Sequence, residues 1–538
     1  MRAAVALLLI CAALAVVAPF FVRGTACGHD LTFHMNSWME VAQQWREGVL
    51  YPRWAAYANY GSGEPRFLFY PPLSWMLGAA LGTLLPWTWV PGAFAALAVV
   101  LAGLAMHRLA REWLAEPYAT LAALAYALNP YLLLTIYVRS AFAELLATAF
   151  LPLLVLWLVR ECPPARMLVP LAVTTAALWL TNIPAAIIAS YTAALLLVAM
   201  SWWRRDFRML WWGGGAMALS LALAAFFVVP VLGEKGWITT AQALSSGVRP
   251  QENFLFTRIG EPEHDEFLRT LSWLAVAELA VSGIALLATW KRRSLDPVLR
   301  RPLALLWIAT LILVLPLSAA AYRWLPELQF VQFPWRWMMF AAIPYAVFVA
   351  TALNIPRGKI WLYGLAFVTL IAICNWRLQP RCDPEDTPQA VAAVYHSGEG
   401  YMGTDEYTPA GADNYEVKPQ FPEVVLRSSD GNPVPSARVT HLHGSTYRKQ
   451  ITVESPQPVQ MVLRLMNYPA WEVTVNGAPV MPASDDPTGR MVIPLTAGHS
   501  QVDVRFTRTP DRWLGDCISL AAAALLYGFW YFQRRRSS

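Results

Sequence analysis

The sequence contains few charged residues. Only 14% of its 538 residues are Asp, Glu, Lys or Arg, and 57% are hydrophobic, whereas a soluble globular chain is about 25% charged. This shortage excludes water as the solvent for most of the chain. The net charge of +6 is modest. The arginines lie mostly in short loops and form no basic stripe, which argues against a nucleic-acid partner.

Long apolar stretches are abundant instead. Crossing a hydrocarbon core of about 30 Å takes roughly 20 helical residues, and such stretches recur up to about position 376 and again at 514–532. They are continuously apolar, which predicts helices and excludes the alternating strands of a barrel. The first run, Ala3–Phe21, could be a cleaved signal peptide. We interpret it as a retained helix because it is long and Arg23 follows directly.

The basic residues indicate how the spans are oriented. Positively charged loops stay in the cytoplasm, and six clusters flank the apolar stretches: Arg108/Arg111, Arg160/Arg166, Arg204/Arg205/Arg208, Lys291–Arg301, Arg357/Lys359 and Arg534–Arg536. Placing all six inside predicts about twelve spans and two cytoplasmic termini. The expected spans are near 3–22, 90–107, 117–138, 140–160, 167–181, 184–203, 209–232, 268–290, 302–321, 335–353, 358–376 and 514–532.

One apolar stretch is not expected to cross. If Tyr70–Pro86 were a full span, every later loop would change side and the arginine clusters would lie outside. We therefore expect it to lie along the outer interface, where Trp75, Trp87 and Trp89 suit the headgroup depth.

The segment 377–513 has a different pattern. Short alternating runs predict strands at Glu423–Arg427, Ala437–His441, Lys449–Val453, Gln460–Leu465, Trp471–Val475, Met491–Pro494 and Gln501–Phe506. Turn signals such as Asn476-Gly477 separate them. We expect a small β-sandwich. The predicted organisation is a membrane module at 1–376 with its first outer loop at 23–89, an extracytoplasmic β-rich domain at 377–513, and a last helix with a basic cytoplasmic tail at 514–538.

The six cysteines have no metal-site spacing. Cys27 and Cys382 would both face an oxidising outer compartment in this topology. A disulfide between the first loop and the neck of the β domain is one expectation, and two free thiols are the alternative.

Polar residues gather first where the chain leaves the first span. If the segment after Gly28 is helical, Asp30 and His34 lie four residues apart on one face and could hydrogen-bond or share a metal ion. A carboxyl group at a buried edge has a raised pKa and can serve as a general base. The alternative is that Asp30 only caps a helix.

Two further outer positions carry buried charge. Glu144 follows Arg139 inside an apolar segment, where an ionisable group costs about 2.5–3.5 kcal/mol unless it faces a partner or a wet cavity. It could instead form an ion pair with Arg139 that only joins two helices. Arg336 follows Gln332 in a Gln-Phe-Pro-Trp-Arg-Trp stretch and suits a phosphate. Its alternative role is that of an interfacial anchor.

A fourth feature is the stretch Tyr401–Pro409 at the entrance to the β domain. Its acids Asp405 and Glu406 and its aromatic rings suit sugar hydroxyls and ring faces. The same composition also suits an ordinary loop.

These motifs together resemble one bacterial membrane-protein family. They are the acid after the first span, the Tyr-Pro-Pro-Leu stretch at Tyr70, the acid after Arg-Ser-Ala-Phe-Ala, the Leu-Thr-Asn-Ile-Pro break and Gln-Phe-Pro-Trp-Arg. The family is described as 6-pyruvoyl-tetrahydropterin-synthase-related and is similar to the GT-C superfamily of integral-membrane glycosyltransferases. The resemblance covers about 1–376, Tyr401–Pro409 and Tyr468–Trp471. No motif of a soluble pterin synthase is present.

The resemblance implies an outer-leaflet reaction in the bacterial inner membrane. A sugar would pass from a polyprenyl phosphate or diphosphate to an envelope glycan, lipid or protein acceptor. Asp30 would be the base, Glu144 the second acid and His34 a second base or ligand. The loop lacks the Asp-Glu pair of some GT-C branches, so no cofactor is certain. A divalent metal is possible, on Asp30, His34 and Glu144. Arg336, Gln332 and Arg139 would bind the donor phosphate, with substrate contacts from His29, Tyr70, Tyr401, Asp405 and Glu406.

Two other functions remain open. A transporter of lipid or polysaccharide would show broken midplane helices in two related halves, and the sequence has no internal repeat. A non-catalytic envelope-assembly scaffold would keep the β domain and would not need Asp30.

Overall fold

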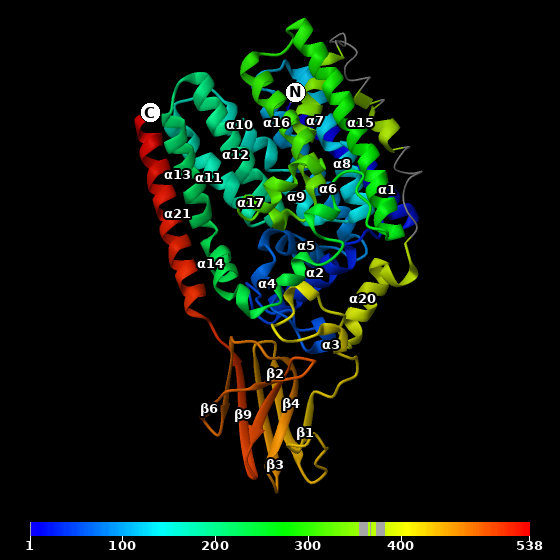
Figure 1. The fold of residues 1–538 in the computed structure, drawn as a ribbon, viewed down its shortest axis with the longest axis vertical. Coiled ribbons are helices and arrows are strands. Elements are labelled where there is room, and N and C mark those ends of the chain that lie inside the picture. Colours follow the sequence, from blue (N-terminus) through cyan, green and yellow to red (C-terminus); the bar gives the residue numbers. More distant parts are fainter. Residues whose placement is uncertain (1, 354–363, 366, 373–381, 538) are drawn as a thin grey trace.

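Helices occupy one end of the molecule and strands the other (Figure 1). The computed structural model describes residues 2–353, 364–365, 367–372 and 382–537. Both termini lie away from the strands, and α2 (Leu31–Arg46), α4 (Arg66–Phe69) and α5 (Pro72–Leu84) lie at the end of the helical bundle that faces them (Figure 1). The segments that follow the first span are therefore next to the β region.

Membrane-spanning helices dominate the bundle. Within the described residues, seven are long and apolar enough to cross: Ala3–Arg23 (in α1, Arg2–Arg23), Val90–Ala110 (α6), Glu116–Arg139 (α7, Glu116–Ala127, with α8, Pro130–Leu134, and η1, Thr135–Arg139), Phe142–Val159 (α9, Phe142–Ala147, with α10, Leu151–Val159), Ile183–Arg204 (α12), Pro262–Arg292 (α15) and Pro510–Arg535 (in α21, Pro510–Ser537). Two more candidates are bent pairs. The segment Ala225–Trp237 turns by 73° from α13 (Arg208–Leu223), and Pro316–Trp324 turns by 90° from α16 (Pro297–Leu313).

The expected count of about twelve spans is not confirmed, although the helical membrane architecture is. The helices at the expected spans 167–181 and 335–353 are α11 (Pro164–Trp179) and α18 (Met338–Ala352), of 16 and 15 residues. The expected span 358–376 falls largely outside the described residues. The stretch at Tyr70–Pro86 forms α5, whose 13 residues reach only about 20 Å. It is thus too short to cross, in line with its predicted place at the interface.

Helix α2 packs on α5 and on the bundle. Its Trp38 is fully buried and stacks on Phe94 of α6 at 5.2 Å. A Cβ at Gly78 of α5 would lie 2.3 Å from the Trp38 ring. Only glycine therefore lets α5 come this close, and the first turns of α2 are held against the ends of the spans.

The strands form two antiparallel sheets. The first has the order β1-β4-β8-β7 and the second β2-β3-β9-β5-β6. The strands are β1 (Val424–Arg427), β2 (Arg438–Ser445), β3 (Arg448–Ser455), β4 (Val459–Met466), β5 (Trp471–Val475), β6 (Ala478–Val480), β7 (Ala483–Asp485), β8 (Arg490–Leu495) and β9 (Gly498–Phe506). All seven expected strands are present, while the short β6 and β7 were not predicted. Apolar residues of both sheets share one core, with Leu463 of β4 and Val504 of β9 fully buried.

A buried ion pair joins the last helix to the bundle. The Glu234 carboxylate of α14 (Ala225–Glu234) accepts from Arg512 Nε and Nη2 of α21 at 2.7 and 2.8 Å. Tyr468 and Thr509 donate to the same group at 2.5 and 3.0 Å. With four hydrogen bonds the buried charge is well satisfied, and Tyr468 fastens the β region to the same point.

A disulfide joins Cys27 to Cys382, 355 residues apart. The expected pairing is thus present, and the free-thiol alternative is wrong. It ties the loop between α1 and α2 to the segment that leads to α20 (Pro388–Ser397). Asp30 lies three residues beyond this crosslink.

Candidate functional site

The loop that carries Asp30 is fixed on the turn between two spans. The backbone N–H groups of His29 and Asp30 donate to the carbonyl oxygens of Val138 and Arg139 at 3.4 and 2.9 Å. Gly28 N–H donates to Ser140 Oγ at 3.0 Å. A Cβ at Gly28 would lie 2.5 Å from backbone atoms of this turn, so only glycine allows the approach. Two segments distant in sequence are thereby held together.

The Asp30 carboxyl group does not act as a helix cap. Asp30 occupies the N-cap position of α2, yet its side chain makes no capping hydrogen bond. The structure therefore does not show the alternative role of Asp30 as a helix cap. Burial raises the pKa of Asp30, and the cations Arg139 and Arg336 oppose the rise. An acid with a raised pKa next to cations is suited to accept a proton.

Glu144 is held by three donors. Its Oε2 accepts from Arg139 Nη1 at 2.8 Å and from Arg336 Nε at 3.1 Å. Its Oε1 accepts from the Tyr131 hydroxyl at 2.5 Å. The Arg139 guanidinium also lies over the Trp335 ring, 4.6 Å from its centroid. The predicted ion pair between Arg139 and Glu144 is therefore present, but it includes a second arginine and fixes both guanidinium groups.

Arg336 is connected to the neck of the β region. Its Nη1 donates to Val331 O at 2.8 Å and to Gln332 Oε1 at 3.3 Å. Gln332 Nε2 in turn donates to Glu406 Oε1 at 3.3 Å. Burial raises the pKa of Glu406, a shift that Gln332 and Arg336 oppose. Arg336 is thus buried inside the site and is not an anchor in the lipid headgroups.

Tyr70 closes the group from the side of α5. The residue is half-buried, and this desolvation raises the pKa of its phenol. Asp30 and Arg336 are its strongest charged neighbours, followed by Glu406 and Glu144. The hydroxyl is therefore a neutral hydrogen-bond donor at neutral pH and borders the same space as Asp30.

Neither predicted histidine resembles Asp30 in its surroundings. Burial lowers the pKa of His34 to about 3, so its ring is neutral, and its Nδ1 lacks a hydrogen-bond partner among the described residues. The ring packs against Phe142 and Tyr70, with centroids at 5.4 and 6.0 Å. His29 is exposed and rests on Phe267 at 5.2 Å.

Two predicted substrate residues are directed elsewhere. The Tyr401 hydroxyl donates to Glu40 Oε1 at 3.2 Å, and burial raises the pKa of that carboxyl group to about 7. Asp405 accepts from Asn414 Nδ2 and from the Tyr415 hydroxyl at 2.8 and 3.0 Å. Both side chains thus hold the stretch 401–409 in place, and of its acids only Glu406 reaches the group around Arg336.

The described residues form no group of metal ligands at the site. Among the described residues no three His, Cys, Asp or Glu side chains come together as ligands. Glu144 already accepts hydrogen bonds from two arginines and a tyrosine. The possible metal set of Asp30, His34 and Glu144 is therefore not formed.

Sequence reasoning missed the polar chain behind Glu144. Asn129 Oδ1 accepts from Tyr131 N–H at 2.8 Å, and Asn129 Nδ2 donates to Glu278 Oε1 at 2.8 Å. Tyr131 then donates to Glu144. Glu278 lies inside the long span α15. An acid in an apolar span is the one signal that could have indicated it.

A family model described as "6-pyruvoyl-tetrahydropterin synthase related domain; membrane protein" matches residues 67–379. The chain belongs to this family. The matched range contains Tyr70, Arg139, Glu144, Gln332 and Arg336, while Asp30 precedes it and Glu406 follows it. No curated protein matches the chain.

Some solved structures are distantly similar. Arabinofuranosyltransferase AftD from Mycobacteria is 20% identical with a TM-score of 0.42, over 70% of this chain and 27% of that one. The oligosaccharyltransferase of Archaeoglobus fulgidus is 16% identical with a TM-score of 0.31, over 74% and 53%. The chain thus spans about a quarter of AftD and about half of the archaeal enzyme. These likenesses are too slight to support an inference, so function has to be argued from the site.

Proposed function

We propose that the protein is a glycosyltransferase that moves a sugar from a polyprenyl-phosphate-linked donor to an acceptor. One observation carries the proposal. The Asp30 carboxylate makes no helix-capping hydrogen bond and lies near two buried guanidinium groups, those of Arg139 and Arg336. Transfer from a phosphate-linked sugar needs a base for the attacking hydroxyl and a cation for the leaving phosphate. The group supplies both.

Each residue has a definite task in this reaction. Asp30 accepts the proton of the acceptor hydroxyl as the oxygen attacks the anomeric carbon. The bond to phosphate breaks with its electrons, and Arg336 and Arg139 stabilise the charge that appears on the leaving oxygen. Glu144 and Tyr131 hold both guanidinium groups in position. Glu406 and Tyr70 border the same space and are suited to bind sugar hydroxyls.

The cellular setting is part of the proposal. The family resemblance favours a bacterial inner membrane, and the basic loops favour an orientation with the site and the β-rich domain outside. We assign 1–376 and 514–538 to the membrane module and 377–513 to the β-rich domain, which we regard as a sandwich. The acceptor would be an envelope glycan, lipid or protein that reaches the site from the outer compartment.

The deciding experiment measures transfer of labelled sugar from a panel of polyprenyl-phosphate donors in nanodiscs. The wild type should turn over at least one donor, and Asp30→Asn, which keeps the size of the side chain, should lower the transfer rate at least about 100-fold, as expected for a missing general base. Glu40→Gln is the matched control, because this buried acid of α2 accepts hydrogen bonds from Tyr57 and Tyr401 and its electrostatic neighbour is Arg66, not Arg139 or Arg336.

The alternatives predict different results. Equal turnover by Asp30→Asn and wild type would refute the role of Asp30. Absence of turnover with every donor, together with equal lipid binding by both proteins, would support a scaffold. Uptake of solute into proteoliposomes would support a transporter.

A further inference from the structure

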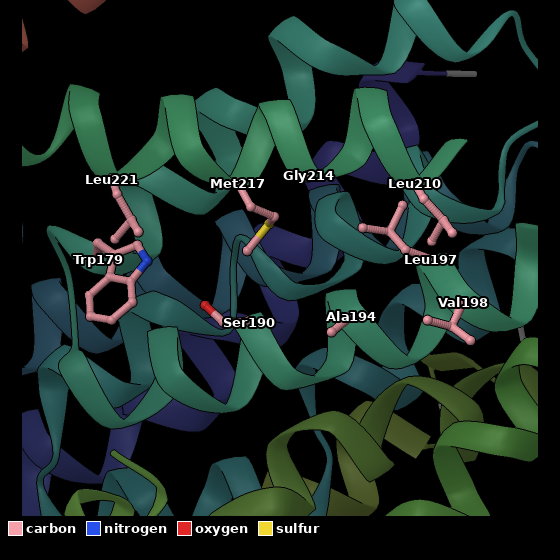
Figure 2. A pocket seen from close by; sticks show the side chains of 9 residues that line it. All are labelled: Trp179, Ser190, Ala194, Leu197, Val198, Leu210, Gly214, Met217 and Leu221. Carbon is pink, nitrogen blue, oxygen red and sulfur yellow. The ribbon is translucent and has the colours of Figure 1, made fainter. Parts of the chain in front are cut away.

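An apolar groove runs along three helices of the bundle. It has a volume of about 470 Å³ and is lined by Trp179 of α11, by Ser190, Ala194, Leu197 and Val198 of α12, and by Leu210, Gly214, Met217 and Leu221 of α13. Trp179 and Leu221 lie at one end, and Leu210, Leu197 and Val198 at the other (Figure 2). Its volume is within the range of about 300–1,000 Å³ that ligands of moderate size occupy.

The groove opens toward lipid. Val198 and Leu221 in its walls are 61% and 42% exposed, and α12 is a membrane-spanning helix. A Cβ at Gly214 would meet no atom within 4 Å, so the wall formed by α13 leaves open space at this glycine. Along α13 the lining from Leu210 to Leu221 extends about 16 Å. In a bilayer only a hydrocarbon chain suits such walls.

Two short connections lead from the groove to the candidate site. Leu180 follows Trp179, and its carbonyl oxygen accepts from Leu73 N–H at 2.8 Å. Leu73 is three residues from Tyr70, the phenol next to Asp30. The second connection begins at Tyr191, the neighbour of Ser190. Its hydroxyl donates to the carbonyl oxygen of Pro326 at 2.8 Å, just before η6 (Leu328–Val331).

The second connection reaches the phosphate-binding arginine. Helix α12 packs on η6. The carbonyl oxygen of Val331, the last residue of η6, accepts from Arg336 Nη1. Both ends of this path are fixed by hydrogen bonds. The distance between a lipid chain in the groove and its headgroup at Arg336 would therefore be constant.

We propose that the groove between α11, α12 and α13 binds the isoprenoid chain of the lipid-linked donor whose phosphate is held by Arg336. This inference rests on the proposed function and adds a chain-binding site to it. The groove would select donors by chain length, because each further buried methylene group strengthens binding. It also places the selective contacts away from the reacting atoms.

The test uses a photoreactive polyprenyl phosphate with the reactive group within the chain. In the wild type, crosslinks should map to 190–198 and 210–221, and a long-chain donor should have a lower KM than a short-chain one. Gly214→Leu and Ala194→Leu fill the groove from opposite walls. Each should abolish these crosslinks and raise the KM of the long-chain donor about tenfold, as expected for the lost burial of a few methylene groups, with the KM of the short-chain donor unchanged.

Gly215→Leu is the matched control. Gly215 is adjacent on α13 and is also exposed, but it does not line the groove, and a Cβ there meets only Leu168 Cδ1 at 3.9 Å. Unchanged crosslinks and KM in Gly214→Leu and Ala194→Leu would overturn the groove even if transfer occurs. Equal labelling of the groove by photoreactive phosphatidylglycerol would overturn the isoprenoid assignment.

The two proposals fail separately. Long-chain crosslinks in the groove without transfer from any donor would keep the lipid site and remove the transferase. Transfer that depends on Asp30 but not on chain length would do the reverse. Arg336→Gln should weaken the binding of long-chain and short-chain donors alike. Weaker binding of the long-chain donor alone would contradict the shared phosphate site.

Discussion

At the scale of single residues, Asp30 depends on two opposing effects. Burial raises the pKa of its carboxyl group, and Arg139 and Arg336 lower it. The group must be ionised to accept a proton, so activity is lost as the pH falls through its pKa. The pH profile therefore reports the balance between burial and the arginines.

The first prediction concerns this balance. Arg139→Gln removes the stronger of the two opposing cations, so the pKa of Asp30 rises further and the acidic limb of the kcat/KM profile moves to higher pH. Transfer rates measured from pH 4 to 9 would show the shift. Arg323→Gln, which changes an exposed arginine, is the control with an unshifted limb. An unchanged limb in Arg139→Gln would contradict the assignment of Asp30 as the base.

The second prediction separates position from stability. Tyr131→Phe removes the hydrogen bond to Glu144, and Tyr126→Phe removes an equally buried one to the Thr148 carbonyl oxygen at 2.8 Å. Each change should cost about 1–3 kcal/mol of folding free energy. Only Tyr131→Phe should lower kcat, by about tenfold, because Glu144 then holds Arg139 and Arg336 less firmly. Equal kcat values in the two variants would show that Tyr131 is purely structural.

At the scale of elements, the last helix depends on one buried ion pair. Side chains of Arg512 and Glu234 are 3% and 0% exposed, and the pair joins α21 to α14. A buried charge that loses its partner is far more costly than a pair that is never formed. The contact thus decides how α21 docks.

The third prediction follows from this asymmetry. Arg512→Ala leaves Glu234 charged and buried, so the free energy of unfolding in detergent should fall by about 3–5 kcal/mol. Adding Glu234→Gln to Arg512→Ala should restore much of it. Arg508→Ala is the control. Arg508 forms an ion pair with Asp516, but its side chain is 45% exposed, and exposed ion pairs contribute about 0–1 kcal/mol. Similar losses in Arg512→Ala and Arg508→Ala would contradict a special role for the pair.

At the scale of the whole molecule, one crosslink connects distant parts. The Cys27–Cys382 disulfide closes a loop of 355 residues and lies between the first span and the β region. Such a bond persists in an oxidising compartment. A disulfide at this point is what the proposed outer placement of the loops that carry the site would allow.

The fourth prediction concerns this crosslink. Cys27→Ser should lower the free energy of unfolding by about 2–4 kcal/mol, and a maleimide should label wild-type Cys27 and Cys382 only after reduction. The melting temperature with and without reductant measures the first effect. Cys517→Ser, which changes an exposed free thiol, should leave it unchanged. Labelling of Cys27 in unreduced membranes would show that the bond is absent in the cell.

The sequence alone determined the class of the protein and its local elements. Continuous apolar runs define membrane helices, because lipid offers no hydrogen bonds to an exposed backbone. Alternation defined seven strands and Asn476-Gly477 a turn, since both patterns are set within a few residues. The single acids Asp30, Glu144 and Glu406 were visible because charge is rare in such a chain. The number of spans was less predictable, because α11 and α18 have only 16 and 15 residues and because α13 and α16 end in bends that composition does not reveal.

Only the tertiary structure decided which polar residues meet. Glu144 and Arg336 are 192 residues apart, and Tyr131 became a site residue only because its hydroxyl reaches Glu144 from α8. Asp405 carries the same carboxylate group as Glu406, and Tyr401 lies in the same stretch, yet their partners Asn414 and Glu40 hold them elsewhere. The physical reason is that a buried charge must find a partner wherever packing brings one, and packing is a property of the whole chain.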